Sequence, residues 1–168
     1  RKWLAAKAAA GFVGITWPKT YGGRELPPIM QVIYDQEEAN YSTPSAIFRI
    51  GLGMCIPTMM RYASEQQKQY YIPKAMNGEH VWCQLFSEPV AGSDVAGIRT
   101  RADRDGDDWI INGQKIWTTG AHFADYGLII TRSDFNAVKH KGLTCFFLDM
   151  KSAGIEAKPI RQISGTSN

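Results

Sequence analysis

The sequence lacks a long apolar run, and it has almost no excess charge of one sign. Charged residues, proline or glycine interrupt every apolar stretch before the ~20 residues that a membrane helix needs. The 19 basic and 16 acidic residues leave a net charge of +3, and the basic residues are spread evenly. A nucleic-acid-binding surface would need a basic cluster. We therefore expect no membrane span and no nucleic-acid partner, and an anionic ligand only at a local site.

Cysteine and histidine are also scarce, and neither has the spacing of a metal site. Cys55, Cys83 and Cys145 are odd in number and contain no C-x-x-C pair, which excludes a disulfide framework and a structural zinc site. The three histidines are dispersed. We interpret the cysteines as small core side chains. This usage favours a reducing compartment, and a cytoplasmic protein without a bound metal is expected.

The common nucleotide-binding and nucleophile motifs are missing. Residues 51–56 (GLGMCI) contain two glycines of a dinucleotide fingerprint but lack the third, and they follow a helical pattern instead of a strand. No P-loop, G-x-S-x-G or H-E-x-x-H sequence occurs. The chain begins with Arg1, has no signal-peptide pattern, and stops in a polar turn. We expect it to be part of a longer protein.

The first half of the chain has helical patterns. An Ala- and Lys-rich run is followed by Gly11, which suits a helix C-terminus, and Ser64 to Gln67 form a capping-box sequence. An aromatic loop with several glycines lies between the first two helices. After the double proline, Ile29, Val32 and Ile33 form the apolar positions of a helix whose wet side carries the polar residues. The predicted helices cover residues 2–10, 27–38, 44–53 and 57–62 and a segment that begins at 64 and is disturbed by Pro73.

From about Val81 the pattern changes to short β-rich runs. These cover residues 81–86, 98–104, 109–111, 115–119, 127–131, 143–149 and 155–159. Asp105-Gly106 and Asn112-Gly113 are typical of tight hairpin turns. The order of elements predicts an α+β protein, with an N-terminal all-α helical domain (residues 1–80) followed by an antiparallel β-barrel or sandwich domain (residues 81–168). It excludes a doubly wound sheet.

Two segments of the second half carry side chains suited to a planar or phosphorylated ligand. In residues 85–94 (LFSEPVAGSD) a strand ends, Pro89 bends the chain, and Gly92 permits close backbone approach. Ser93 and Asp94 could cap a short helical turn whose N–H groups suit a phosphate. Residues 115–121 (KIWTTGA) combine a flat ring with hydroxyl groups. From the residues alone, an ordinary capped turn and a buried strand with a core Trp are the favoured interpretations of the two segments.

Four segments in register resemble the acyl-CoA dehydrogenase family of flavoenzymes. They are residues 17–23 (WPKTYGG), 87–94 (SEPVAGSD), 107–115 (DDWIINGQK) and 117–119 (WTT), the last followed by Ala124-Asp125. The likeness covers nearly the whole chain. The family commonly has Thr at Ser87, Gly at Val90 and Ile at Thr118, and these departures keep the hydroxyl at Ser87 and alter little else.

The resemblance implies that the β domain binds FAD. It places main-chain groups at the pyrimidine end of the flavin, with the Ser87 hydroxyl near N1 and O2. It places Trp117 against the ring, with Thr118 beside it, and the Thr119 hydroxyl at N5. Gly92 and Ser93 would approach the FAD diphosphate, and Ser93 also the acyl-CoA thioester tail. The implied cofactor-binding residues are Gln84, Leu85, Phe86, Ser87, Gly92, Ser93, Trp117, Thr118 and Thr119, and residues 48–54 would wall the acyl pocket.

The implied reaction is α,β-desaturation of an acyl-CoA thioester, with electrons passed to an electron-transferring flavoprotein. The family's carboxylate base lies in a C-terminal helical domain outside this sequence, so none of Glu37, Glu38 and Glu88 is nominated and no catalytic residue is expected in this chain. Glu37 and Glu38 are assigned to a solvated helix face. The family forms homo- or hetero-oligomers, dimers or tetramers, so exposed apolar surface is expected on the helical half. An acyl-CoA oxidase, a flavin monooxygenase and a catalytically silent partner subunit are the alternatives.

Overall fold

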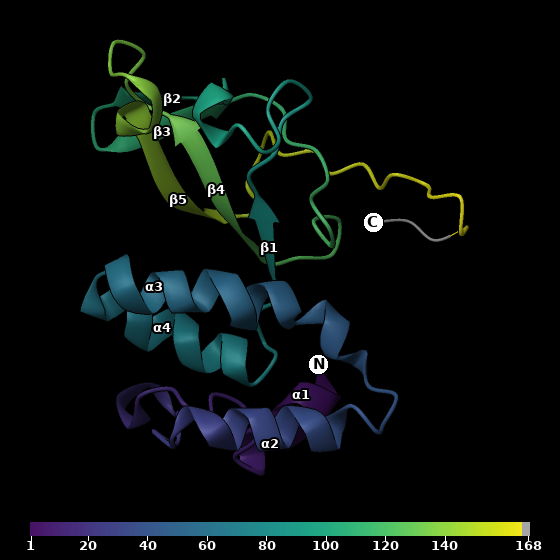
Figure 1. The fold of residues 1–168 in the computed structure, drawn as a ribbon. Helices are drawn as coiled ribbons and strands as arrows, with labels where there is room; N and C mark the ends of the chain where they lie inside the picture. The colour runs from purple at the N-terminus through teal and green to yellow at the C-terminus, as the bar shows by residue number, and fades with distance from the viewer. Residues whose placement is uncertain (166–168) are drawn as a thin grey trace. The chain divides into compact units, whose positions relative to one another are not determined.

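The computed structural model describes residues 1–165 and divides into two compact units. The first unit is Arg1–Val81 and the second begins at Trp82 (Figure 1). Helices make up the first unit, and all the strands belong to the second. The predicted α+β class, with a helical part followed by a β part, is therefore confirmed. No helix within residues 1–165 has both the length and the apolar character that a membrane crossing requires.

The helical unit contains two layers of helices. Figure 1 shows α1 (Lys2–Ala9) and α2 (Pro28–Glu38) in one layer, and α3 (Ile56–Tyr62) and α4 (Glu65–Met76) in the other. The predicted capping box forms at the start of α4, where Ser64 accepts a hydrogen bond from the Gln67 backbone N–H and the Gln67 side chain accepts one in return. Pro73 lies inside α4 without ending it. The side chains of this unit that are at most 1% exposed are Leu4, Cys55, Ile56, Met59 and Ile72.

Helix α2 forms as predicted, with Glu37 exposed, but the neighbouring Glu38 packs against α1. Glu38 accepts a hydrogen bond from Lys7 of α1 at 2.6 Å and another from Tyr34 at 2.9 Å. Burial and the Glu38 carboxylate raise the pKa of Tyr34 to about 12. The expectation of a solvated Glu38 is therefore wrong, because this carboxylate joins two helices. The apolar positions of α2 are exposed instead, with Ile29 58% and Val32 49% accessible.

The helix predicted for residues 44–53 is broken into different helical forms. A 3₁₀ turn covers Pro44–Ile47, and a π-helical stretch covers Gly51–Cys55 and runs directly into α3. The two glycines of the incomplete dinucleotide fingerprint lie inside this π-helical stretch, so it is not a phosphate loop. A π-bulge widens the helix by one residue per turn and is frequent at functional sites.

The sheet of the second unit is built around β4 (Tyr126–Arg132). Along one edge β4 pairs antiparallel with β5 (Leu143–Asp149) over its full length. Along the other edge β1 (Trp82–Leu85) and the start of β2 (Arg101–Asp105) pair with it in parallel. Strand β3 (Asp108–Asn112) forms a hairpin with β2. The sheet is therefore mixed and open, which corrects the expected antiparallel barrel or sandwich.

The hairpin prediction is confirmed at one of its two positions. At the β2–β3 turn Gly106 adopts a φ of 61°, which an L side chain rarely adopts. Asn112-Gly113 instead ends β3, and the chain continues without a strand. A Cβ atom on Gly113 would lie 2.7 Å from the Thr100 Cα atom, so glycine is required here by the close approach of two backbones.

Three of the predicted β-rich runs differ from the structure. Residues 115–119 and 155–159 are not strands, and β2 starts at Arg101, three residues later than expected. The interpretation of all three cysteines as core side chains is also corrected. Cys55 and Cys83 are buried, and burial raises the pKa of Cys83 to about 12, but Cys145 lies at an exposed position of β5.

Candidate functional site

The first part of the candidate site is the end of β1 and the residues that follow it. Gln84 and Leu85 are the last residues of the strand, and Phe86 and Ser87 follow it directly. Within residues 1–165, β4 is the only strand that pairs with β1. No other described strand lies beside Gln84 and Leu85 at the end of β1, and sheet edges of this kind can hydrogen-bond a ligand. This geometry suits the main-chain role expected of the four residues.

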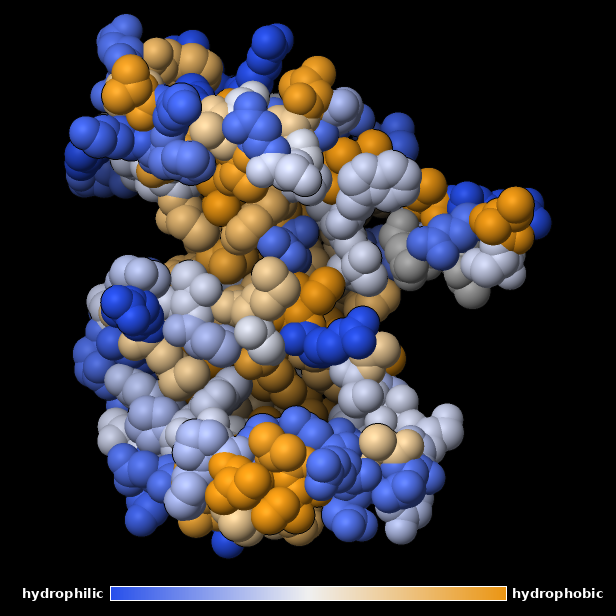
Figure 2. Space-filling view, viewed as in Figure 1, coloured by the Kyte–Doolittle hydropathy of each residue, from blue (hydrophilic) through white to orange (hydrophobic). Residues whose placement is uncertain are grey.

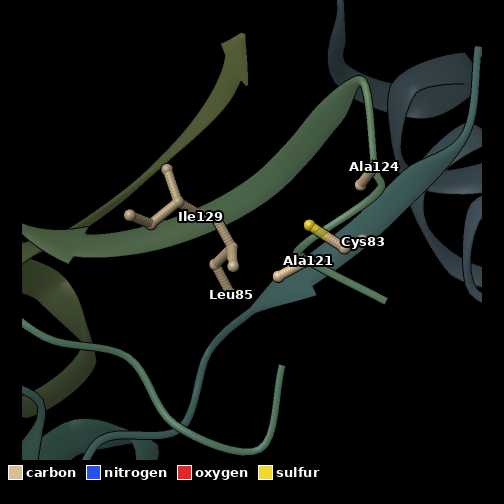
Figure 3. Packing of buried hydrophobic residues seen from close by; sticks show 5 residues of the cluster. All are labelled: Cys83, Leu85, Ala121, Ala124 and Ile129. Carbon is tan, nitrogen blue, oxygen red and sulfur yellow. The ribbon is translucent and has the colours of Figure 1, made fainter. Parts of the chain in front are cut away.

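A short turn packs against β1 and brings the second predicted segment close to it. Ala121 and Ala124, from the turn that begins at Thr118, are buried in one cluster with Cys83, Leu85 and Ile129. Figure 3 shows the cluster, with Ala121 beside Cys83 of β1 and Leu85 facing Ile129 of β4. The small alanine side chains permit this close packing. The turn thus holds Thr118 and Thr119 on the β1 side of the sheet.

Trp117 is the most unusual residue of this region. Its ring is 71% exposed, although a Trp side chain is normally well buried. Its backbone adopts a φ of 59°, a strained conformation for a bulky residue that costs roughly 1–3 kcal/mol. Such strain is concentrated at functional sites, where the surrounding structure maintains it. A flat ring held outward on a constrained backbone suits stacking on a planar ligand, and a buried core Trp is excluded.

Beside this ring the two segments are joined by hydrogen bonds and a buried ion pair. The backbone N–H of Ile116 donates to the Ser87 carbonyl at 2.9 Å. The Lys115 ammonium lies 2.8 Å from the Glu88 carboxylate, with 7% and 4% of the two side chains exposed. Burial lowers the pKa of Lys115, although the Glu88 carboxylate opposes this shift. Residues 86–88 and 115–116 therefore form one connected structure.

Three hydrogen-bond donors, including Lys115, hold the Glu88 carboxylate. The carboxylate also accepts backbone N–H groups from Arg99 at 2.7 Å and Thr100 at 2.9 Å. Burial alone would raise the pKa of Glu88, but the hydrogen bonds from Lys115 and the two N–H groups outweigh it and lower the pKa to about 2. A carboxylate in this state is a poor proton acceptor. This environment argues against Glu88 as a catalytic base.

The loop that contains Gly92 and Ser93 is fixed at both ends and open in the middle. At one end Glu88 and Ala91 form a two-way backbone bridge. At the other end the buried Arg132 side chain donates to the carbonyl groups of Ala96 and Ile98. Gly92, Ser93 and Asp94 are exposed. Asp94 precedes the 3₁₀ turn Val95–Gly97 but makes no side-chain cap, so the expected capping interaction is not formed.

The structure thus brings most predicted site residues together. Phe86, Ser87 and the 117–119 segment are linked through Lys115 and Ile116. No hydrogen bond within residues 1–165 links Gly92 or Ser93 to that cluster. Sequence reasoning did not single out Lys115, Glu88 and Arg132 as site-building residues, although the first two occur inside the motifs. No cluster of metal-ligating side chains occurs in the described part of the chain.

A separate cavity of about 530 Å³ lies within the helical unit. Phe48 and Leu52, from the segment expected to wall an acyl pocket, line it together with Trp3. The charged side chains of Lys7 and Glu38 also reach it. The cavity is therefore bordered by aromatic and apolar side chains together with several charged ones, which include Asp35 and Arg49.

Comparisons with known proteins identify both units. Residues 1–79 match the N-terminal domain of acyl-CoA dehydrogenases, and residues 83–168 match the middle domain. The chain is 43% identical to the acyl-CoA dehydrogenase FadE34 of Mycobacterium tuberculosis over 96% of its length, which covers 22% of that protein.

Two solved structures extend this likeness to the fold. The Tcur3481-Tcur3483 steroid ACAD has a TM-score of 0.87 and 33% identity, with 98% of this chain and 42% of that chain covered. A glutaryl-CoA dehydrogenase from Mycobacterium smegmatis, in complex with FADH2, has a TM-score of 0.78 and 29% identity, with 94% and 39% covered. The chain spans less than half the length of these three proteins. It belongs to the acyl-CoA dehydrogenase family of oxidoreductases, of which it contains the N-terminal helical domain and the middle β domain.

Proposed function

We propose that the β unit, residues 81–168, is the flavin platform of an FAD-dependent acyl-CoA dehydrogenase that desaturates an acyl-CoA thioester. The observation that carries the proposal is the exposed Trp117 on a strained backbone, in a segment that is hydrogen-bonded to Ser87 just after β1. The relative in complex with FADH2 supports FAD as the cofactor. When bound, FAD would accept the β-hydrogen of the substrate as a hydride.

In this proposal the residues of the chain bind FAD and orient its flavin ring. Main-chain groups of Gln84, Leu85, Phe86 and Ser87 hold the pyrimidine end of the flavin. The Phe86 and Ser87 carbonyl groups already accept hydrogen bonds from Lys115 and Ile116, which leaves the backbone N–H groups as the better candidates for the ligand. Trp117 and Thr118 pack against the ring, and Thr119 donates to N5.

Substrate binding is assigned to Ser93 and to the cavity of the helical unit. The acidity of the α-proton must be raised before a carboxylate can remove it, and hydrogen bonds to the thioester carbonyl provide this effect. We place the base in the C-terminal domain of the whole protein. One relative is titled a steroid ACAD, which supports including bulky acyl-CoA thioesters among the candidate substrates.

The partners are an electron-transferring flavoprotein and further copies or a second type of subunit. The exposed apolar face of α2 supports this part of the proposal. Figure 2 shows apolar side chains gathered over α2, and Ile29, Met30, Val32 and Ile33 are each more than 40% exposed. Faces of this kind on soluble proteins usually contact another domain or subunit. A cytoplasmic dimer or tetramer is proposed.

The deciding experiment is the visible spectrum of the whole protein under anaerobic conditions. We expect a flavin absorption band that bleaches when saturated acyl-CoA thioesters of different length and bulk are added. Oxygen consumption with peroxide formation during turnover would instead indicate an oxidase or monooxygenase. A protein purified without flavin would indicate a silent partner subunit, and the dehydrogenase proposal would be rejected.

Gly92→Ala is expected to weaken cofactor binding without affecting stability. A Cβ atom at this position meets no atom of the chain within 4 Å, so the change in the free energy of unfolding should stay within roughly 0.5 kcal/mol. The added methyl group would occupy space through which we propose the FAD diphosphate approaches. FAD titration of the deflavinated protein measures the effect. Gly53→Ala, in the helical unit, is the matched control, because a Cβ atom there also meets no atom within 4 Å and Gly53 has no positive φ. An unchanged Kd for FAD would exclude close approach at Gly92.

A further inference from the structure

One buried ion pair connects the segment after β1 with the segment that leads to Trp117. The Lys115 ammonium donates both to the Glu88 carboxylate at 2.8 Å and to the Phe86 carbonyl at 3.0 Å. It therefore joins the residues on both sides of Ser87. Lys115 also lies two positions before Trp117, so a movement of its side chain or backbone would be transmitted to the exposed ring.

The other partner of the pair extends the connection into the sheet. Glu88 accepts the backbone N–H groups of Arg99 and Thr100 with its two oxygens. The Thr100 carbonyl in turn accepts a hydrogen bond from the Arg132 N–H at the end of β4, at 2.7 Å. The carboxylate thus connects the loop after β1 with the segment that enters β2 and with β4.

Stability alone gives a poor explanation for such a pair. Desolvation of two charges offsets much of their attraction, and apolar side chains of similar size often serve equally well in a core. Glu88 also accepts hydrogen bonds from three donors, and these stabilise its ionised form and make it a poor acceptor for a substrate proton. What an ion pair adds over apolar packing is directional bonding, which fixes distances between segments.

We propose that Glu88 and Lys115 are positioning residues, which set the spacing between the backbone after β1 and the Trp117–Thr119 segment so that both fit one flavin ring. This inference rests on the proposed flavin function. Neither residue contacts the ligand in this account. Their effect passes through the Phe86 carbonyl, the Ser87–Ile116 hydrogen bond and the conformation of Trp117.

The test uses Lys115→Met in the whole protein, because Met keeps the length of the side chain and removes the ammonium. We expect a folded protein in which the Kd for FAD rises, comparable to the roughly 10- to 100-fold losses seen when groups that orient metal ligands are removed. We also expect a shift of the visible flavin band and of its midpoint potential, which a purely structural role would not change. Lys151→Met is the control, since Lys151 also pairs with a carboxylate, Asp125 at 3.1 Å, but with a side chain that is 75% exposed.

The double variant Glu88→Gln/Lys115→Met separates positioning from the effect of an unpaired buried charge. It removes both charges, so it leaves no unpaired buried charge and should be more stable than the single variant. A folded double variant with weak FAD binding and a shifted band would support the inference. Wild-type values in either folded variant would overturn it, as would failure of both variants to fold, because the pair would then be needed for folding itself. If the wild-type protein binds no FAD, the proposed function is overturned together with the inference.

Discussion

Glu88→Ala is expected to lower the free energy of unfolding at pH 7 by about 3–5 kcal/mol, the range for removal of one partner from a buried ion pair. The variant leaves the Lys115 ammonium, whose side chain is 7% exposed, without its carboxylate. It also leaves the Arg99 and Thr100 N–H groups without their acceptor. Urea unfolding followed by tryptophan fluorescence measures the loss, and Asp103→Ala is the control.

The Asp103→Ala control distinguishes the effect of breaking a buried ion pair from the effect of breaking an exposed one. Asp103 pairs with Arg101 at 2.6 Å, but the two side chains are 47% and 55% exposed. Exposed pairs of this kind contribute roughly 0–1 kcal/mol. Equal losses in the two variants would show that burial of the Glu88–Lys115 pair has no special importance, and the structural account of this pair would be wrong.

The lowered pKa of Glu88 also predicts how the free energy of unfolding depends on pH. The pKa of Glu88 is about 2 in the folded protein and ordinarily 4.5, so its ionised form stabilises the fold fully above pH 4.5. This contribution is lost as the pH falls from about 4.5 through the native pKa of about 2. The difference in stability between the wild-type protein and Glu88→Ala should therefore narrow over this interval. A difference that stays constant from pH 7 to pH 2 would contradict the assigned ionisation.

Local patterns in the sequence predicted those elements that depend on neighbouring residues. The capping box at Ser64 and the hairpin glycine Gly106 are examples, because their hydrogen bonds or φ angles are set within a few positions. The parallel pairing of β1 with β4 is different. It joins Trp82 to Tyr126, and no local signal specifies a partner more than forty residues away. The antiparallel expectation followed from hairpin turns, and it failed where the partner was distant.

The segment around Trp117 was predicted as a strand for an understandable reason. Lys115 to Thr119 has the β-branched and aromatic residues that favour strands. In the structure, hydrogen bonds to the β1 loop and the Lys115–Glu88 pair hold this segment in an irregular conformation, in which Trp117 adopts a positive φ. Tertiary contacts thus override the local propensity at the candidate site, which is where such conflicts are expected. The residue types of this segment suited a planar ligand, but only the resemblance to a known family indicated that the ligand is a flavin.

Thr119→Val is expected to slow anaerobic flavin reduction by an acyl-CoA thioester about 100-fold, the typical loss when one donor to a developing charge is removed. Valine has the shape of threonine without its hydroxyl group. Thr119 is exposed in the turn after Trp117, and within residues 1–165 its hydroxyl has no hydrogen-bond partner, so the substitution breaks no recorded bond of the fold. The loss should therefore appear in the rate and leave the thermal stability unchanged.

Stopped-flow absorbance at the flavin band measures this rate in the whole protein. The control is Thr20→Val, which removes an equally exposed hydroxyl from the helical unit. Because the proposed donor acts mainly on the reduced flavin, Thr119→Val should also lower the midpoint potential, while the Kd for oxidised FAD changes much less. A Thr119→Val protein that is reduced at the wild-type rate would remove Thr119 from the hydride-transfer step. A rate loss of the same size in Thr20→Val would assign the effect to the fold and not to the site.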